Sequence, residues 1–230
     1  MGGRAARAIA ITLAILVVLL VAADRIGVYI AERTAGSTIQ SSQKLASRPD
    51  VDITGFPFLT QLAAGKFDEI VVTAKNVPVD KNTPVLDISR LRVVLHTITV
   101  SRDFSRVHAD TANATATITF DDLHQALGLD VSYAGNGRIR ATERVSVGGT
   151  AVSATLTTQP ALVNGALTFT RTAVNGAGQV SQAATSALTK VFDVTVPLQG
   201  LPFKVRVTSL RVDKGGVLID LSGNDLTYTN

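Results

Sequence analysis

The side chains in this sequence that are best suited to acid–base chemistry are three histidines and one acidic pair. Asp121 and Asp122 lie just before His124, a spacing at which a carboxylate could orient an imidazole for proton transfer. Acids are also typical of the first turn of a helix, where the helix dipole favours negative charge. We take the helix start as the main interpretation and keep an acid–histidine hydrolytic site as the alternative.

Other catalytic and metal-binding patterns are missing from the sequence. The remaining histidines, His96 and His108, have no partner at metal-ligand spacing, and the chain contains no cysteine. No GxSxG nucleophile motif occurs, and segment 176–181, GAGQVS, has only two of the three glycines of a dinucleotide loop. We therefore expect no metal and no cofactor, identify no catalytic residue, and leave open whether the protein is an enzyme.

Arginine side chains suggest a different chemistry, because a guanidinium group binds phosphate through forked hydrogen bonds. Arg90 and Arg92 have the spacing of one strand face, and Arg102 lies just beyond the end of that strand. A solvated outer strand face is the commoner explanation of such arginines. The net charge is +4, or +2 without the two N-terminal arginines, which is too low to indicate a nucleic-acid partner.

The N-terminus predicts export of the chain. Arg4 and Arg7 precede an uncharged apolar run at residues 8–23, which ends in the small residues VAA. The run is either a signal peptide cleaved after that site or an uncleaved anchor, and the following IGVYIA could continue the same helix. Its 16 residues are fewer than the roughly 20 that a spanning helix prefers, so both alternatives stay open. In either case the arginines remain inside, and the rest of the chain lies outside the cytoplasmic membrane.

Residues 1–24 are thus predicted to be a signal peptide or N-terminal membrane anchor. Residues 25–230 are predicted to form a single domain, because no change in composition divides them. Hydrophobic alternation and turn residues predict an antiparallel meander with a few helices, which is an α+β fold. The expected strands are 51–56, 67–77, 86–100 and 107–120; the expected turns are 81–84, 135–137, 164–165 and 213–216; the expected helices are one ending before Pro49, 121–127 and 180–192. Strict alternation places Phe67, Glu69, Val71 and Thr73 on one face of their strand and Ile70, Val72 and Ala74 on the other.

An apolar cluster, GFPFLTQL at residues 55–62, stands out in a chain that has few aromatic residues. Gly55 allows the preceding strand to bend, Pro57 suits the first turn of a short helix, and Gly65 suits its end. Phe58 and its apolar neighbours then form one side of that helix. The cluster is either a plug that seals the core or a surface at a cavity entrance or membrane, because aromatic residues dominate both environments.

Three segments occur in a specific order: GFPFLTQL, then GKFDEI at residues 65–70, then LPF at residues 201–203. Together with the apolar N-terminus and the helix that follows it, this order resembles the LmeA-like family of actinobacterial cell-envelope phospholipid-binding proteins. The resemblance extends over nearly the whole chain.

The resemblance implies an extracytoplasmic protein that binds phospholipid, with lipid transfer as one form of that role, and supports envelope glycolipid or lipoglycan maintenance. It implies secretion or tethering to the outer face of the cytoplasmic membrane, a membrane surface as partner, and anionic lipid, with the phosphatidylinositol type favoured. It also implies a TULIP-like tube, in which a curved antiparallel sheet wraps around a long N-terminal helix with short additional helices. No catalytic residue is implied. A lipid-directed hydrolase, either phosphatase or phospholipase, and a structural envelope adaptor remain the alternatives.

Burial of acyl chains provides a physical basis for such binding, at roughly 0.8 kcal/mol per buried CH₂. A lipid cavity requires apolar walls and a polar or cationic rim. The candidate acyl-chain residues are Phe56, Phe58, Leu59, Leu62, Phe67, Leu86, Ile88, Leu91, Val93 and Leu95, and the candidate headgroup residues are Arg90, Arg92 and Arg102.

Overall fold

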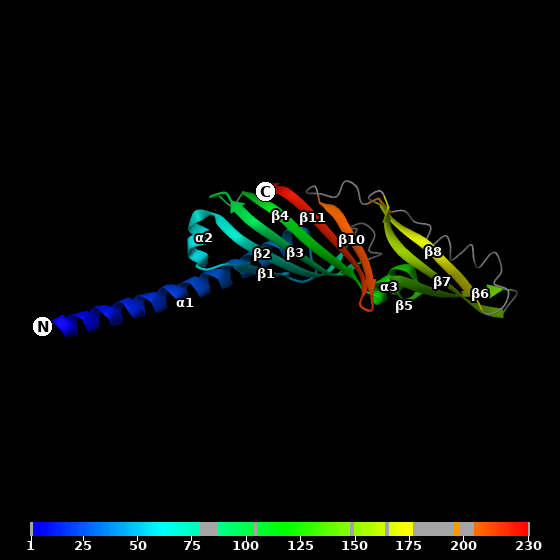
Figure 1. The fold of residues 1–230 in the computed structure, drawn as a ribbon, viewed down its shortest axis with the longest axis horizontal. Helices are drawn as coiled ribbons and strands as arrows, with labels where there is room; N and C mark the ends of the chain where they lie inside the picture. The colour runs from blue at the N-terminus through cyan, green and yellow to red at the C-terminus, as the bar shows by residue number, and fades with distance from the viewer. Residues whose placement is uncertain are drawn as a thin grey trace.

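The computed structural model describes residues 2–78, 87–103, 105–147, 150–163, 166–176, 196–197 and 205–229. Figure 1 shows an elongated molecule, in which the first half of helix α1 projects from one end and two β-sheets follow one another along the long axis. The helices are α1 (Gly2–Gln43), α2 (Phe58–Ala64) and α3 (Phe120–Leu127). The strands are β1 (Asp50–Thr54), β2 (Lys66–Pro78), β3 (Asp87–Val100), β4 (Arg106–Ile118), β5 (Asp130–Gly135), β6 (Arg138–Val147), β7 (Thr150–Val163), β8 (Ala166–Gly176), β9 (Val196–Pro197), β10 (Arg206–Asp213) and β11 (Gly216–Thr229).

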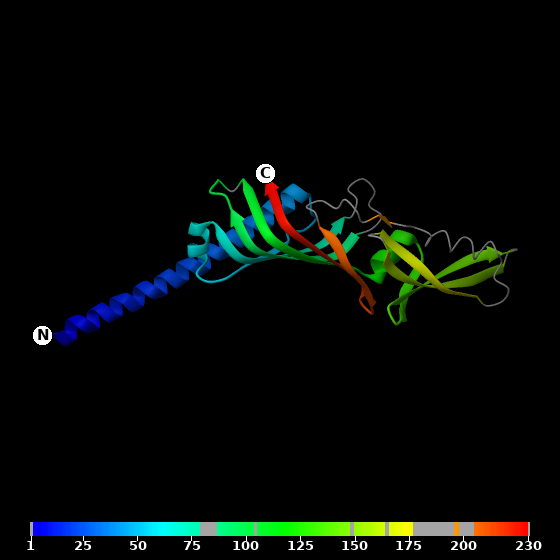
Figure 2. The same ribbon diagram turned by 45° about the horizontal axis from the view of Figure 1, so that its top comes forward.

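Helix α1 is continuous from the apolar run into the domain, so IGVYIA does extend the same helix. The helix contains no proline and ends shortly before Pro49, with Lys44 in the left-handed region at φ 56°. Its apolar first half is exposed, and α1 is a helix long and apolar enough, by length and composition, to cross a membrane. Its second half passes along the large sheet (Figure 2).

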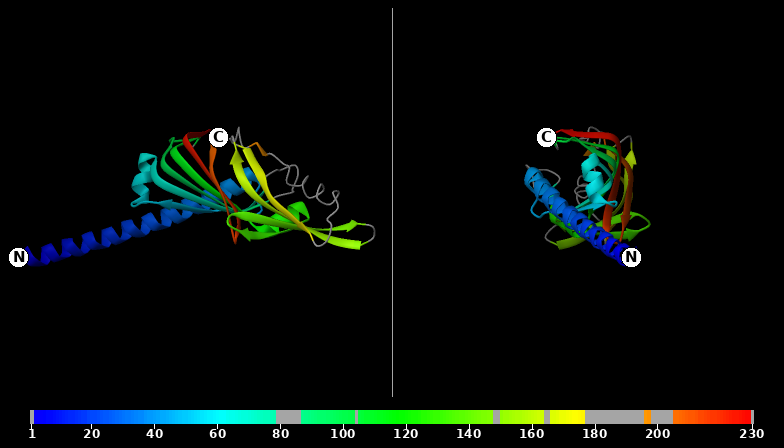
Figure 3. Two further views of the ribbon diagram at one scale, coloured as in Figure 1. Left: turned by 45° about the vertical axis from the view of Figure 1, so that its right-hand side comes forward. Right: turned by 90° about the vertical axis from the view of Figure 1, so that its left-hand side faces the viewer.

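The large sheet has the strand order β1-β2-β3-β4-β11-β10, and all neighbouring strands are antiparallel. Viewed along the molecule, the sheet curls into an arc and α1 crosses its open side (Figure 3, right). Val28 of α1 is buried against the sheet together with Phe58, Phe67 and Ile98. The predicted curved antiparallel sheet around a long N-terminal helix is therefore confirmed.

The expected alternation of side chains is interrupted where β2 pairs with β3 around Thr97. Phe67 pairs with Ile98 and Glu69 with His96, whereas Thr97 between them has the left-handed φ of 52°. Ile70, three residues from Phe67, packs against the same core cluster, so the prediction that the two side chains lie on opposite faces is wrong. On β3, Leu95 and Ile98 are also three residues apart and pack in the same cluster, and Thr97 between them, at positive φ, turns that strand locally.

The second sheet has the order β5-β6-β7-β8-β9 and is also antiparallel. The hairpin turn at residues 135–137 joins β5 to β6, and the turn before Gly216 joins β10 to β11, as predicted. Val163 pairs with Ala166, so β7 and β8 form the expected hairpin, although its two turn residues lie outside the described residues. The expected turn at 81–84 and the expected helix at 180–192 also lie outside them.

The two sheets share a hydrophobic cluster at their junction. Ile139 of β6 is buried with Val212 of β10 and Val217 of β11, and Phe120 and Leu123 of α3 pack against them. Thr119 caps α3 through a capping box, which confirms the predicted helix start. The shared cluster supports our proposal that residues 25–230 form one domain.

Candidate lipid-binding site

An apolar groove lies between the last turns of α1 and the strands β2 and β3. It encloses about 310 Å³, which is at the lower end of the range for small-molecule pockets. Among the described residues that line it, Gln43 is the one with a polar side chain, and the others are Ile39, Leu45, Val72, Ala74, Val77, Pro78, Leu91 and Val93. We call this space the α1 groove.

Local backbone geometry builds the α1 groove. Val72 pairs with Val93 and Ala74 with Leu91, so these four side chains lie in two adjacent cross-strand rows. Asn76 then adopts a left-handed φ of 51°, which lets Val77 reach the same lining as Ala74 three residues earlier. On the opposite side of the groove, Ile39 and Gln43 lie one helical turn apart on α1.

The predicted acyl-chain residues on β3 fall at different distances from this groove. Leu91 and Val93 line it. Ile88 pairs with Val77, a lining residue, and Leu95 packs against the core cluster around Phe58. Leu86 lies outside the described residues.

The predicted headgroup residues do not gather at the groove. Arg90 and Arg92 alternate along β3 with Leu91 and Val93, so both arginines lie on the other face of the sheet, where they are exposed. Arg102 lies in the turn between β3 and β4, beyond the opposite end of the strand.

Arg102 lines a second, smaller hollow, which we call the end pocket. It has a volume of about 200 Å³ and brings Arg102 together with Leu62 of α2 and Phe67 of β2, three of the predicted residues. Gly65 closes α2 at φ 64°, and its carbonyl accepts a 2.8 Å hydrogen bond from the Val100 amide. This bond fixes α2 beside the β3–β4 turn.

The turn beside Arg102 is held by the Asp103 carboxylate. The Ser101 hydroxyl donates to Asp103 at 2.6 Å and the Ser105 amide at 3.3 Å. Hydrogen bonds from Ser101 and Ser105 lower the pKa of Asp103 to about 2. The carboxylate therefore stays ionised at any ordinary pH and keeps the turn closed.

The GFPFLTQL cluster contains both a plug and an exposed surface. Phe58 is 1% exposed, and its ring centroid lies 6.2 Å from that of Phe67. Phe56, Leu59 and Leu62 are 62%, 39% and 39% exposed, respectively. Pro57 is the residue just before α2 rather than in its first turn, and Gly55 has φ 99°. The core interpretation thus fits Phe58, whereas a role for the three exposed residues in lipid contact stays a prediction.

Asp122 and His124, the candidate acid–histidine pair, both form hydrogen bonds within the fold. The Asp122 carboxylate accepts from the Thr119 amide at 3.0 Å and from the hydroxyls of Thr119 and Ser89. Burial opposes ionisation of Asp122, but these hydrogen bonds outweigh it and lower the pKa of the carboxyl. His124 places Nδ1 2.8 Å from the Leu129 carbonyl oxygen. Both side chains therefore serve to fix the ends of α3.

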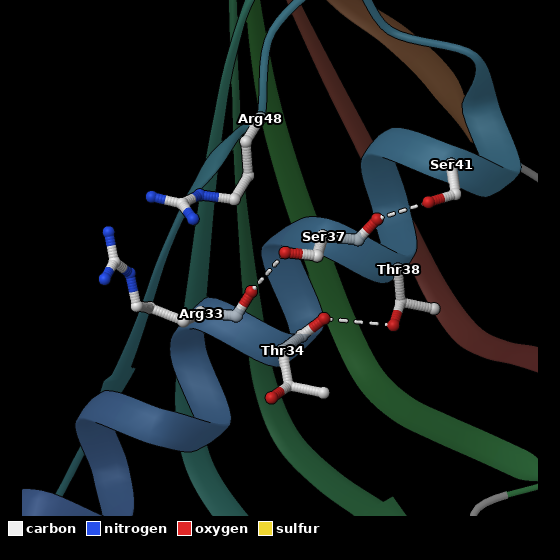
Figure 4. Close-up of a pocket in the computed structure, with 6 residues that line it drawn as sticks. All are labelled: Arg33, Thr34, Ser37, Thr38, Ser41 and Arg48. Carbon is white, nitrogen blue, oxygen red and sulfur yellow. Dashed lines mark hydrogen bonds between the residues drawn. The ribbon is translucent and has the colours of Figure 1, made fainter.

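Sequence reasoning missed a third hollow, on the side of α1 that faces away from the sheet. Figure 4 shows Arg33 of α1 and Arg48 of the following loop extending their guanidinium groups toward each other, to one side of the hydroxyl side chains that line the rest of the hollow. Gly36 lies buried beneath, where a Cβ would come within 2.7 Å of the Pro49 carbonyl oxygen. The sequence did contain a signal for this hollow, because its polar lining residues have the spacing of one helix face. They are Thr34, Ser37, Thr38 and Ser41. Their hydroxyls donate to backbone carbonyls one turn earlier.

Comparison with known proteins identifies the family of the chain. Comparison with curated proteins found no matching sequence. The model of the family described as LmeA-like phospholipid-binding matches residues 22–222, which includes the second half of α1, the smaller sheet and all of the large sheet except the second half of β11. Since this match covers most of the 230 residues, the chain belongs to the LmeA-like phospholipid-binding family.

Proposed function

We propose that the protein holds an acyl chain of a phospholipid in the α1 groove, outside the cytoplasmic membrane, and carries lipid in support of envelope glycolipid or lipoglycan maintenance. The observation that supports this proposal most directly is the apolar lining of the groove in a member of a phospholipid-binding family. Each methylene that leaves water for this lining contributes roughly 0.8 kcal/mol before the costs of binding. An apolar chain is the ligand that such a lining favours.

Tethering and topology form the second part of the proposal. Helix α1 passes without a break from the apolar run into the domain, so an uncleaved helix would hold the domain directly on the membrane. Arg4 and Arg7 at its start favour the cytoplasmic side. The domain then lies on the outer face.

The headgroup is proposed to be anionic, with the phosphatidylinositol type as the first candidate. Of the three predicted headgroup arginines, Arg102 lies beside apolar side chains, because it lines the end pocket together with Leu62 and Phe67. Because the end pocket is separate from the α1 groove, the proposed role of Arg102 is to form forked hydrogen bonds with a lipid phosphate at the membrane, before the acyl chain occupies the groove. Arg90 and Arg92 are less suited to this role since they lie on the face away from the α1 groove.

A matched pair of variants on β3 tests the groove. Leu91→Gln places an amide in the apolar lining, and Arg90→Gln creates the same side chain on the other face of the strand. We expect about tenfold less co-purifying phospholipid for Leu91→Gln, since an unpaired amide in an apolar site costs about 1–3 kcal/mol, and no change for Arg90→Gln.

Native mass spectrometry with organic extraction of the full-length protein provides the measurement, and headgroup analysis of the extract tests the anionic assignment. A wild-type protein that contains no phospholipid and does not take up lipid from anionic liposomes would refute the proposed function. Equal lipid loss in the two variants would refute the α1 groove as the site.

A further inference from the structure

An exposed apolar surface lies on and just before α2. It consists of Phe56, Leu59 and Leu62, and we call it the α2 tip. Phe56 is the most exposed of the three, at 62%. Large apolar side chains that cluster on a surface usually mark a contact with a partner or a membrane.

The α2 tip is fixed to α1 just beyond its apolar run. The Leu59 amide donates a 2.8 Å hydrogen bond to the carboxylate of Asp24, which is 2% exposed. Arg25 pairs with the same carboxylate, and its guanidinium group lies 5.2 Å from the centroid of the Phe56 ring. The α2 tip therefore contacts the two α1 residues that directly follow residue 23, through the Leu59 backbone amide and the Phe56 ring.

A glycine on α1 allows α2 to approach closely. A Cβ on Gly27 would lie 3.3 Å from the Leu59 side chain and 3.5 Å from the Phe58 ring. Because Phe58 is also buried in the domain core, α2 cannot separate from α1 without opening that core. The position of the α2 tip relative to the apolar run is thus set by the fold.

This position corresponds to the surface of a bilayer. The apolar run at residues 8–23 has a length of about 24 Å at 1.5 Å per residue, most of the roughly 30 Å hydrocarbon core of a membrane. If α1 spans the membrane with this run, Asp24 lies at the outer boundary and α2 lies beside it. Figure 1 agrees, because α2 sits at the end of the large sheet from which the free part of α1 projects.

We infer that the α2 tip docks on the outer leaflet of the membrane in which α1 is anchored, and this inference rests on the proposed tether. Phe56, Leu59 and Leu62 enter the boundary between headgroups and acyl chains, as the apolar face of an interfacial helix does. The exposed cations Arg25, Lys66 and Arg102 lie on the adjoining α1, β2 and β3–β4 turn, where they can meet lipid phosphates. Docking also turns the end pocket, which Leu62 and Arg102 line, toward the lipid surface.

The absence of tryptophan from the chain makes a direct test available. Phe56→Trp in the full-length protein, reconstituted into phosphatidylcholine–phosphatidylglycerol vesicles, places the one tryptophan of the variant on the α2 tip. We expect lipids brominated on their acyl chains to quench its fluorescence by about half, as for an interfacial residue. Tyr133→Trp is the control, because Tyr133 packs at the junction of the two sheets, and bromolipids should leave it unquenched.

Vesicle flotation separates this inference from the proposed tether. Protein that does not float with vesicles contradicts the tether, whereas protein that floats with an unquenched Trp at position 56 contradicts docking. A blue-shifted but unquenched Trp would mean that protein covers the α2 tip, and this outcome also overturns the inference. Leu62→Trp repeats the measurement at a second exposed position in case Phe56→Trp does not fold.

Discussion

Phe58 and Phe56 differ by two positions and carry the same side chain, yet the structure assigns them opposite energetic roles. Phe58 is 1% exposed and Phe56 is 62% exposed. Truncation of each to alanine removes the same atoms, so any difference in stability between the two variants measures burial rather than residue type. The pair therefore tests the burial that the structure gives to this cluster.

The expected loss for Phe58→Ala follows from the area it buries. A buried phenylalanine removes on the order of 150 Å² from water, which at about 25 cal/mol per Å² corresponds to about 4 kcal/mol. Measured Phe→Ala truncations in protein cores, which leave a cavity as this one would between Phe67, Val28 and Ile98, lower the free energy of unfolding by about 3–5 kcal/mol, which agrees with the estimate from area. Phe56→Ala removes a mostly solvated ring and should cost about 0.5 kcal/mol or less.

Urea unfolding of the full-length protein in detergent, followed by circular dichroism, measures both free energies of unfolding. We expect a much lower unfolding midpoint for Phe58→Ala and a nearly unchanged one for Phe56→Ala. A loss below about 1 kcal/mol for Phe58→Ala, or equal losses for the two variants, would show that the ring is not in the core.

Two further predictions concern local structure. Asp122→Asn should cost about 1 kcal/mol at neutral pH through weaker hydrogen bonds at the start of α3. Folding lowers the Asp122 pKa, so this contribution is fully present above the unfolded pKa of about 3.9 and is lost as pH falls through the folded pKa. Melting temperatures of wild type and variant should therefore begin to converge below about pH 4 and coincide below the folded pKa. Gly65→Ala should lower the free energy of unfolding by about 1–3 kcal/mol, because the added Cβ would lie 2.7 Å from the Val100 carbonyl oxygen. Gly128→Ala is the control: Gly128 has a similar φ but open space around it, so this variant should lose about 1 kcal/mol. Similar melting temperatures for the two alanine variants would contradict the close approach at Gly65.

The elements that sequence patterns predicted well are those whose signals are local. The long strands β3 and β4, the turn before Gly216 and the helix that contains Asp121 and Asp122 all depend on residues that are neighbours in the chain, although α3 begins at Phe120, one residue before its predicted start. Alternation along β3 also separates Arg90 and Arg92 from Leu91 and Val93, which weakens the prediction of a cationic rim at the groove.

The features that sequence patterns could not predict arise from backbone conformation and distant contacts. Thr97 is β-branched and disfavours a positive φ, so nothing local indicates the change of face on β3 that brings Leu95 and Ile98 into one cluster. The α1 groove joins Ile39 to Leu91, which lie far apart in the chain. The different burial of Phe56 and Phe58 likewise follows from how α1 and β2 meet around α2.

The α1 groove and the end pocket lie at different heights above the proposed membrane surface, and this separation bears on how the protein would handle lipid. Between Asp24, beside the α2 tip, and Ile39, in the α1 groove, α1 rises about 22 Å at 1.5 Å per residue. An acyl chain held in the groove would therefore be clear of the bilayer, whereas the end pocket with Arg102 lies beside α2. The core around Phe58 and Phe67 separates the two spaces in this structure, with Ile70 and Leu95 extending the apolar surface toward the groove. Under the proposed function, a lipid whose acyl chain occupies the groove has left the bilayer, so the distance between the two hollows agrees with the proposed carrier role.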